Sequence, residues 1–256
     1  MKRFAFLLPF SLIAGFAPIS DPAEITYEWL VEQGKESGYS DHIPHFRKLF
    51  EMAKVRNFLE FGVGYSTHYF LERCEEVVSV EFVVEGAGPA FMQEMMRLYR
   101  EKSHWIPYVF FSGYPDPTNW APYQYVGSDA VSKAAFVQCA THKSFAWVDG
   151  SYLEELNDFI TSLCEGYRID LAFVDPGIYL RGDLVQLLFD KVPMIAAHDS
   201  NHRFFKDSHD AYGYSRIETP AHYEEIHIGR GQGTTFWILK NESTANLIEE
   251  MKKYAL

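Results

Sequence analysis

The sequence predicts an α/β protein with a doubly wound, mostly parallel sheet and helices on both faces. Short apolar segments alternate with segments of helical periodicity along most of the chain. Several of the apolar segments end in an acidic residue, as strands that lead into a binding edge do. The last two, residues 223–228 and 234–239, are joined only by Gly229–Gly233, which indicates a closing antiparallel hairpin.

Composition supports a single globular domain. The 256 residues are 47% hydrophobic and 23% charged, and no repeat or long linker divides them. The formal net charge is −12, and no run of lysine and arginine is present. A nucleic-acid partner is therefore not expected, because it would need a basic surface.

The N-terminus resembles a signal peptide or targeting segment over residues 1–17, ahead of a domain that covers residues 18–256. A basic start, Met1-Lys2-Arg3, precedes an apolar run that ends near Ala17, although Pro18 disfavours cleavage there. The run is too short to span a bilayer, so no transmembrane span is expected. A working leader would make the protein exported, secreted or lumenal. Without it the protein would be cytoplasmic, and the segment would be buried or swapped.

Helical patterns precede the first strand, within residues 18–55. Asp21-Pro22 is an N-cap with proline at the first helical position, and it predicts a helix up to Gly34. A second helical pattern covers residues 46–53, and the apolar segment 57–61 then predicts a buried strand.

The rest of the chain alternates in the same way. Ser151 and Glu154 form a capping box that begins the clearest helical pattern. Strands are predicted at residues 77–82, 105–111, 144–148, 169–175 and 192–199, and helices at residues 91–102, 128–139, 151–164, 184–188 and 247–251. A proline- and aromatic-rich loop at residues 113–123 is where substrate specificity is expected to lie.

The first strand leads into the motif Glu60-Phe61-Gly62-Val63-Gly64, and the second ends at Glu81. Glycines let a ligand approach the backbone, and the free amides at the start of the following helix favour polar groups. An acid about 20 residues after such a turn is placed to hold a ribose. Thr67 stands where a dinucleotide fingerprint has its third glycine, which disfavours an NAD or nucleotide-sugar enzyme.

These residues resemble motif I of the class I S-adenosylmethionine (SAM)-dependent methyltransferases. The resemblance implies a seven-stranded sheet with a C-terminal antiparallel hairpin, and SAM as cofactor. It also implies that Glu60, Gly62 and Gly64 hold the methionine part, Glu81 the ribose and Asp149 the adenine. The chain has one strand–helix pair more than this fold needs. We expect residues 105–143 to be the insertion, rather than the strand at 144–148.

A second resemblance, to small-molecule and sugar O-methyltransferases, comes from Phe173-Val174-Asp175 and His198-Asp199. It implies that Asp175, His198 and Asp199 are catalytic and that the acceptor is a hydroxyl of a small molecule or saccharide. In metal-dependent members the equivalents of Asp175 and Asp199, here with Asn201, would hold Mg²⁺, which prefers oxygen ligands. The alternative is His198 or His202 as general base.

Two departures leave a different function open. Pro176 follows Asp175 where that family often has glycine, and Asn201 is not adjacent to Asp199. SAM is also a cytosolic metabolite in bacteria, so an exported methyltransferase would need a special setting. The alternative function is therefore a catalytically inactive, methyltransferase-like secreted binding or host-interaction protein.

Overall fold

The fold is described from a computed structural model. It describes residue 19 and residues 21–83, 88–111, 150–177, 180–203 and 212–256. The leader-like segment 1–17, Asp149 and the patterns predicted at residues 113–123, 128–139 and 144–148 lie outside the described residues.

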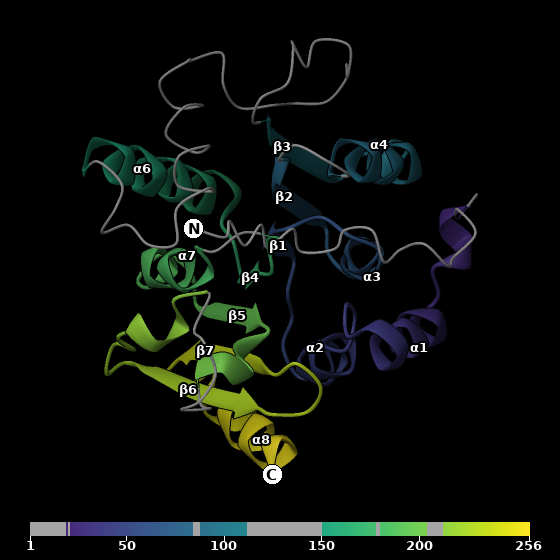
Figure 1. Ribbon diagram of the computed structural model, residues 1–256. Coiled ribbons are helices and arrows are strands. Elements are labelled where there is room, and N and C mark those ends of the chain that lie inside the picture. Colours follow the sequence, from purple (N-terminus) through teal and green to yellow (C-terminus); the bar gives the residue numbers. More distant parts are fainter. Residues whose placement is uncertain (1–18, 20, 84–87, 112–149, 178–179, 204–211) are drawn as a thin grey trace, which may run out of the picture.

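A seven-stranded sheet forms the centre of the described structure, in the order β3-β2-β1-β4-β5-β7-β6 (Figure 1). The first five strands in this order pair in parallel, and β7 is antiparallel to both β5 and β6. The strands are β1 (Asn57–Phe61), β2 (Glu76–Val83), β3 (Trp105–Phe111), β4 (Leu171–Val174), β5 (Met194–His198), β6 (Tyr223–Ile228) and β7 (Thr234–Leu239). This sheet, closed by an antiparallel hairpin, has the architecture that the resemblance to class I methyltransferases implies.

Helices cover both faces of the sheet (Figure 1). One face packs against α1, α2, α3, α4 and α8, and the other against α6 and α7. The helices are α1 (Tyr27–Ser37), α2 (Ile43–Phe50), α3 (Ser66–Leu71), α4 (Gly88–Tyr99), α6 (Gly150–Tyr167), α7 (Arg181–Leu188) and α8 (Ala245–Ala255), with short 3₁₀ turns η2 (Pro22–Glu24), η5 (Ser200–Arg203) and η6 (Tyr214–Arg216).

Strand β1 shows how the sequence builds these two layers. Its side chains alternate between the faces, so Phe58 joins the core under α2 and α3, while Leu59 and Phe61 join the core under α6 and α7. Phe58 stacks on Phe70 of α3 with ring centroids 4.1 Å apart. Burying such rings contributes roughly 1.5–3 kcal/mol each, which fixes the strand between its two helical layers.

The position of β3 corrects one expectation. We expected Trp105–Phe111 to belong to an insertion, but this strand pairs along its length with β2 and forms one edge of the sheet. The seven strands are complete with it. An insertion therefore cannot begin at residue 105, and any extra strand–helix pair would lie within residues 112–149, outside the described residues.

The first predicted helix is two elements. Asp21 caps a single 3₁₀ turn, η2, through its side chain, and Glu24 completes the capping box. The chain leaves helical geometry at Ile25, and Thr26 then caps α1 by accepting from the amide of Trp29 at 3.1 Å. Helix α1 continues past Gly34 to the left-handed Gly38.

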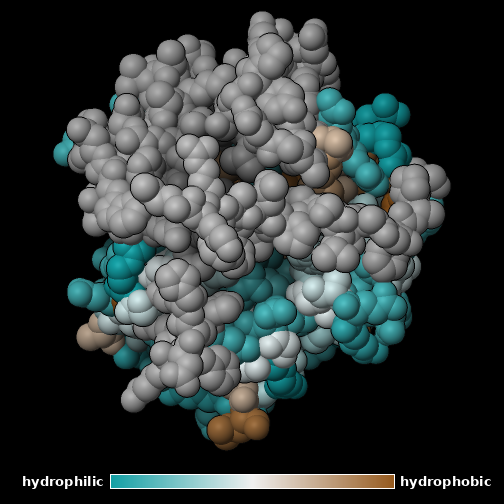
Figure 2. Space-filling view, viewed as in Figure 1, coloured by the Kyte–Doolittle hydropathy of each residue, from teal (hydrophilic) through white to brown (hydrophobic). Residues whose placement is uncertain are grey.

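The described surface in the space-filling view is mainly hydrophilic, with a hydrophobic patch at the C-terminal end of the chain (Figure 2). Within the described residues, no helix has both the length and the apolar character that crossing a membrane requires.

Candidate active site

Polar groups meet at one edge of the sheet, where four neighbouring parallel strands end. In sheet order, β2 carries Glu81, β1 leads into the loop Gly62–Gly64, β4 leads into Asp175, and β5 ends in His198, with Asp199 next. Carboxyl ends of parallel strands are where open α/β sheets bind ligands. The structure therefore brings together all the described strand-end residues that the sequence predicts.

Gly62 is required by the backbone. Its φ is +101°, and a Cβ there would stand 2.4 Å from the carbonyl oxygen of Asp175. Its amide donates to the carbonyl of Val80 at 2.9 Å. Gly62 thus allows the ends of β1 and β4 to approach each other closely, so the fold requires this glycine whether or not a ligand binds.

Gly64 has different surroundings. A Cβ at this position would meet only Ser66 Oγ, at 3.8 Å. The space beside its Cα is open, as the approach of a ligand would require. Of the two glycines, Gly64 fits the cofactor role that the sequence predicts for both.

The loop amides, however, are not free. The amide of Val63 donates to Glu81 Oε2 at 2.5 Å, and that of Gly64 donates to Thr67 Oγ1 at 3.1 Å. These two amides precede the start of α3 at Ser66, so they are not the helix-start amides for which a ligand is expected. Their hydrogen bonds instead fix the glycine loop to β2 and to α3.

Glu60 is fully buried between β1, β2 and α3. Its Oε1 accepts from Ser79 Oγ at 2.6 Å and from Thr67 Oγ1 at 2.9 Å, while Oε2 is buried and without a partner among the described residues. Burial raises the pKa of Glu60 to about 8. Oε1 thus connects β1 with β2 and α3, whereas Oε2 has no hydrogen-bond partner in the part of the chain that the structure describes.

Glu81 combines two tasks at the end of β2. Besides the amide of Val63, it accepts from the amide of Phe82 at 2.9 Å. Burial raises its pKa to about 7, against the lowering effect of these hydrogen bonds. Its carboxylate is thereby held in one position at the edge where a ribose is expected.

Asp175 and Asp199 form a closed group with two basic side chains. Arg181 Nη1 lies 2.8 Å from Asp175 Oδ1 and 2.7 Å from Asp199 Oδ2. His198 Nδ1 lies 3.3 Å from Asp175 Oδ2 and 3.6 Å from Asp199 Oδ1. We call these four residues the charge quartet. Arg181 and His198 are buried, whereas the aspartates keep about a fifth of their side chains exposed, at 20% and 21%.

His198 is held protonated. Burial by itself would lower its pKa, but the charges of Asp175 and Asp199 outweigh burial and raise it to about 10. Its Nε2 contacts Asp41, which precedes α2, so both ring nitrogens face carboxylates. An imidazole that already carries its proton cannot act as a general base at neutral pH. The protonated form that these carboxylates favour speaks against the general-base role that the sequence left open for His198, and that role stays a prediction. The side chain of His202 is outside what is described.

The residues do not fit the expected Mg²⁺ site. The acidic oxygens of Asp175 and Asp199 do converge, within 4.8 Å of each other and of His198. However, Arg181 already lies between them. The Asn201 side chain instead contacts the hairpin loop, donating to Gly231 O at 2.9 Å, with its Oδ1 3.1 Å from His227 Nε2. The expectation that Asn201 completes a metal-ligand set with these aspartates is wrong.

Two residues of this site were not anticipated from the sequence. Arg181 is the first residue of α7 and follows Asp175 closely in the sequence. A basic residue at the start of the helix after a strand-end acid is a sequence pattern that could have indicated this pair. Asp41 lies 157 positions from His198, so no local pattern connects them. A third buried residue, His42, packs its ring on His198 with centroids 4.7 Å apart, and burial holds its pKa well below the usual value.

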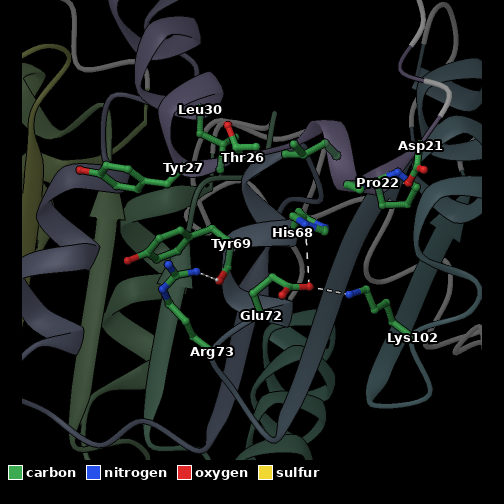
Figure 3. Close-up of a pocket in the computed structure, with 12 residues that line it drawn as sticks. Asp21, Pro22, Thr26, Tyr27, Leu30, His68, Tyr69, Glu72, Arg73 and Lys102 are labelled. Atoms are coloured by element: carbon green, nitrogen blue, oxygen red, sulfur yellow. Dashed lines mark hydrogen bonds and ion pairs between the residues drawn. The ribbon is translucent and has the colours of Figure 1, made fainter.

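A separate pocket of about 590 Å³ lies between the N-terminal segment and α3 (Figure 3). Tyr27 and Tyr69 form part of its wall, and Glu72 contacts both His68 and Lys102 at its base (Figure 3). None of its lining residues is a strand-end residue, so this pocket is distinct from the site above.

Comparison with known proteins gives distant structural likenesses. No family model matches the chain, and no curated protein matches it in sequence. Among solved structures, the chain is similar to the methyltransferase PaMTH1 of Podospora anserina in its SAH-bound form, with 14% identity, 94% of this chain and 99% of that chain covered, and a TM-score of 0.47. It is similar to the O-methyltransferase TomG of Streptomyces achromogenes in complex with SAM, with 13% identity, 90% of this chain and 95% of that chain covered, and a TM-score of 0.48. It is also similar to a methyltransferase from Geobacter sulfurreducens, with 10% identity, 90% of this chain and 94% of that chain covered, and a TM-score of 0.44.

Proposed function

We propose that this protein is a SAM-dependent O-methyltransferase that acts on a hydroxyl group of a small molecule. The observation that carries the proposal is the meeting of four strand ends at one sheet edge, each with a group suited to the cofactor or to the reaction. The glycine loop, Glu81 and the two aspartates of the charge quartet are neighbours there because β2, β1, β4 and β5 are adjacent in the sheet.

The site residues fit the cofactor in three respects. Glu60 Oε2 is buried and lacks a partner among the described residues, and the ammonium group of a methionine moiety would satisfy it. The open space at Gly64 would admit that moiety. Glu81 offers a fixed carboxylate for the ribose hydroxyls. Asp149, proposed to meet the adenine, lies outside the described residues.

The reaction would take place beside Asp175 and Asp199. SAM supplies an electrophilic methyl group on a positively charged sulfur. Asp175 and Asp199 are the partly exposed members of the charge quartet, so one of them would accept the hydrogen bond of the acceptor hydroxyl. As the oxygen forms its bond to the methyl carbon, the bond from that carbon to the sulfur would break, S-adenosylhomocysteine would be the leaving group, and the hydroxyl proton would pass to that carboxylate. Arg181 and His198 would hold the carboxylates in place, because both are buried and bonded to them.

Calorimetric titration with SAM tests the cofactor site. Wild-type protein should bind SAM, and Glu81→Ala should weaken binding by about tenfold or more, which corresponds to about 1.4 kcal/mol. Glu76→Ala is the matched control, because Glu76 begins the same strand at the opposite edge. Equal affinities of the two variants would contradict the role of Glu81.

Methyl transfer itself separates the enzyme from the inactive alternative. The labelled methyl group of SAM should appear on a hydroxyl compound from a panel of small phenols and saccharides. Asp175→Asn should slow the transfer by at least about a hundredfold, as expected for loss of a general base. SAM binding without transfer to any member of the panel would favour the non-catalytic binding protein.

We also propose that residues 1–17 direct export, with the mature domain beginning near residue 18. The support is the basic start followed by an apolar run. Expression of the full chain in a bacterial host should yield periplasmic protein, and N-terminal sequencing should begin after Ala17. Retention of Met1 on cytoplasmic protein would contradict export.

A further inference from the structure

The charge quartet places a basic side chain where a metal ion is expected. Asp175 and Asp199 follow neighbouring parallel strands, and their carboxylates offer the kind of oxygen pair that Mg²⁺ or Mn²⁺ binds. Two such carboxylates, close together and largely buried, cannot both stay ionised without a compensating cation. The identity of that cation decides whether the site depends on metal.

Arg181 is the compensating cation in this structure. A single nitrogen, Nη1, bridges one oxygen of each aspartate, at 2.8 and 2.7 Å. The guanidinium is fixed from its other sides, because Nε donates to the carbonyl of Pro176 at 2.8 Å and the ring of Tyr212 lies 4.1 Å from Cζ. The backbone carbonyl of Pro176 thus orients this arginine. Pro176 is the residue at which the sequence departs from the O-methyltransferases that it resembles.

The packing of α7 explains why the guanidinium reaches this position. Gly182, the next residue, donates its amide to Tyr212 O at 2.9 Å, and a Cβ on Gly182 would stand 2.3 Å from Gly213 O. The start of α7 is therefore pressed against the 212–214 segment. This contact holds the first residue of the helix directed at the ends of β4 and β5.

The remaining aspartate oxygens face His198. Nδ1 lies near Asp175 Oδ2 and Asp199 Oδ1, and Nε2 is bound to Asp41. Each of the four carboxylate oxygens in the quartet consequently has a basic partner. A divalent ion could enter only by displacing a buried guanidinium, which would then be left as an unpaired charge.

We propose that Arg181 takes the place of a divalent metal and makes this site metal-independent. Arg181 acts as a positioning residue: it neutralises Asp175 and Asp199 and fixes their partly exposed oxygens for the acceptor. Arg181 neutralises the two carboxylates whether or not SAM is bound, although the catalytic meaning of the arrangement rests on the proposed methyl transfer. The prediction about metal binding can therefore fail or succeed separately from the proposed function.

Titration with Mn²⁺, followed by electron paramagnetic resonance and calorimetry, tests this inference on the full chain. Wild-type protein should show no Mn²⁺ binding that requires Asp175, as judged against Asp175→Asn. Arg181→Met removes the charge but keeps an apolar stem, and it should gain a Mn²⁺ site at least tenfold tighter than any in the wild type. The gain should disappear in Arg181→Met with Asp199→Asn.

Arg216→Met is the matched control, because Arg216 forms an exposed pair with Asp183 at 3.0 Å near the same segment. It should gain no Mn²⁺ site. If Arg181→Met does not fold by circular dichroism, Arg181→Gln, which keeps hydrogen-bonding capacity, replaces it. Asp175-dependent Mn²⁺ binding by the wild type, or a folded Arg181 variant that gains no binding, would overturn the inference.

Discussion

Gly62 and Gly64 lie two positions apart in one motif, yet the structure gives them different tasks. Gly62 adopts a positive φ against the backbone of Asp175, whereas Gly64 faces open space. A glycine motif read from sequence does not distinguish these two uses, because both need the absence of a Cβ. Only the contact with Asp175, 113 positions later, separates them.

Alanine at each position should separate the two tasks experimentally. Gly62→Ala should lower the free energy of unfolding by about 3 kcal/mol, because the new Cβ clashes with a backbone carbonyl and the φ is unfavourable for alanine. Gly64→Ala should change stability by less than about 0.5 kcal/mol but weaken SAM binding by about tenfold. Urea unfolding and calorimetry measure the two effects. A Gly64→Ala protein with unchanged SAM affinity would remove Gly64 from the cofactor site.

Individual site residues could be predicted where they end a strand. Glu81, Asp175, His198 and Asp199 were found because a parallel sheet gathers its strand ends at one edge. Their partners were not found in this way. Asp41 and Arg181 come from the turn before α2 and the start of α7, and their contacts depend on how these elements pack.

At the scale of elements, Asp41 connects three parts of the chain. It contacts His198 at the end of β5, and its Oδ2 accepts from the amide of Gln232 at 2.6 Å in the β6–β7 loop. Gly231 in that loop has φ +64°, and a Cβ there would collide with the Asp41 carboxylate. One side chain thus fixes the N-terminal helices to the C-terminal hairpin beside the candidate site.

Asp41→Ala should therefore destabilise the protein by about 2 kcal/mol, since it removes a partly buried charged hydrogen-bond partner. His222→Ala is the control. It removes an exposed pair with Asp190, worth less than about 0.5 kcal/mol. Urea unfolding at pH 7 gives both values. An Asp41→Ala protein as stable as His222→Ala would show that the contacts of Asp41 with His198 and Gln232 contribute nothing measurable to the free energy of unfolding.

The elements themselves were largely predictable, with two exceptions of physical interest. Residues 223–228 and 234–239 form β6 and β7 as expected, because a short glycine-rich connection allows only a hairpin. The strand at 105–111 was expected to be extra, because sequence alone could not show which of two apolar segments pairs with β2. The first helix divides at Ile25, where Thr26 offers a second cap that competes with Asp21.

At the scale of the whole molecule, several buried groups hold protons more tightly in the folded state. Burial raises the pKa of Glu60 from 4.5 to about 8 and that of Glu81 from 4.5 to about 7. The carboxylates around His198 outweigh its burial and raise its pKa from 6.5 to about 10. The unfolded chain releases these protons at lower pH. The contribution of these groups to the free energy of unfolding is therefore present at low pH, and it is lost as the pH rises through their pKa values in the folded state.

The free energy of unfolding should consequently fall between pH 7 and pH 9. His42, whose pKa is lowered by burial and by the nearby His198, acts in the opposite sense only below pH 6.5, outside this window. His198→Gln should make the dependence shallower, and the exposed His222→Gln should leave it unchanged. Urea midpoints at pH 7, 8 and 9 provide the measurement. A wild-type midpoint that rises over this range would contradict the protonation assigned to the charge quartet.

The strand ends should bind SAM, and Arg181 between Asp175 and Asp199 should take the position that a metal ion would have beside it. The most direct test is calorimetric titration of the wild-type protein with SAM in EDTA, repeated in excess Mg²⁺. We predict binding of one SAM molecule with the same affinity in both buffers. Absence of binding by folded protein, or binding that appears only with Mg²⁺, would contradict the claim.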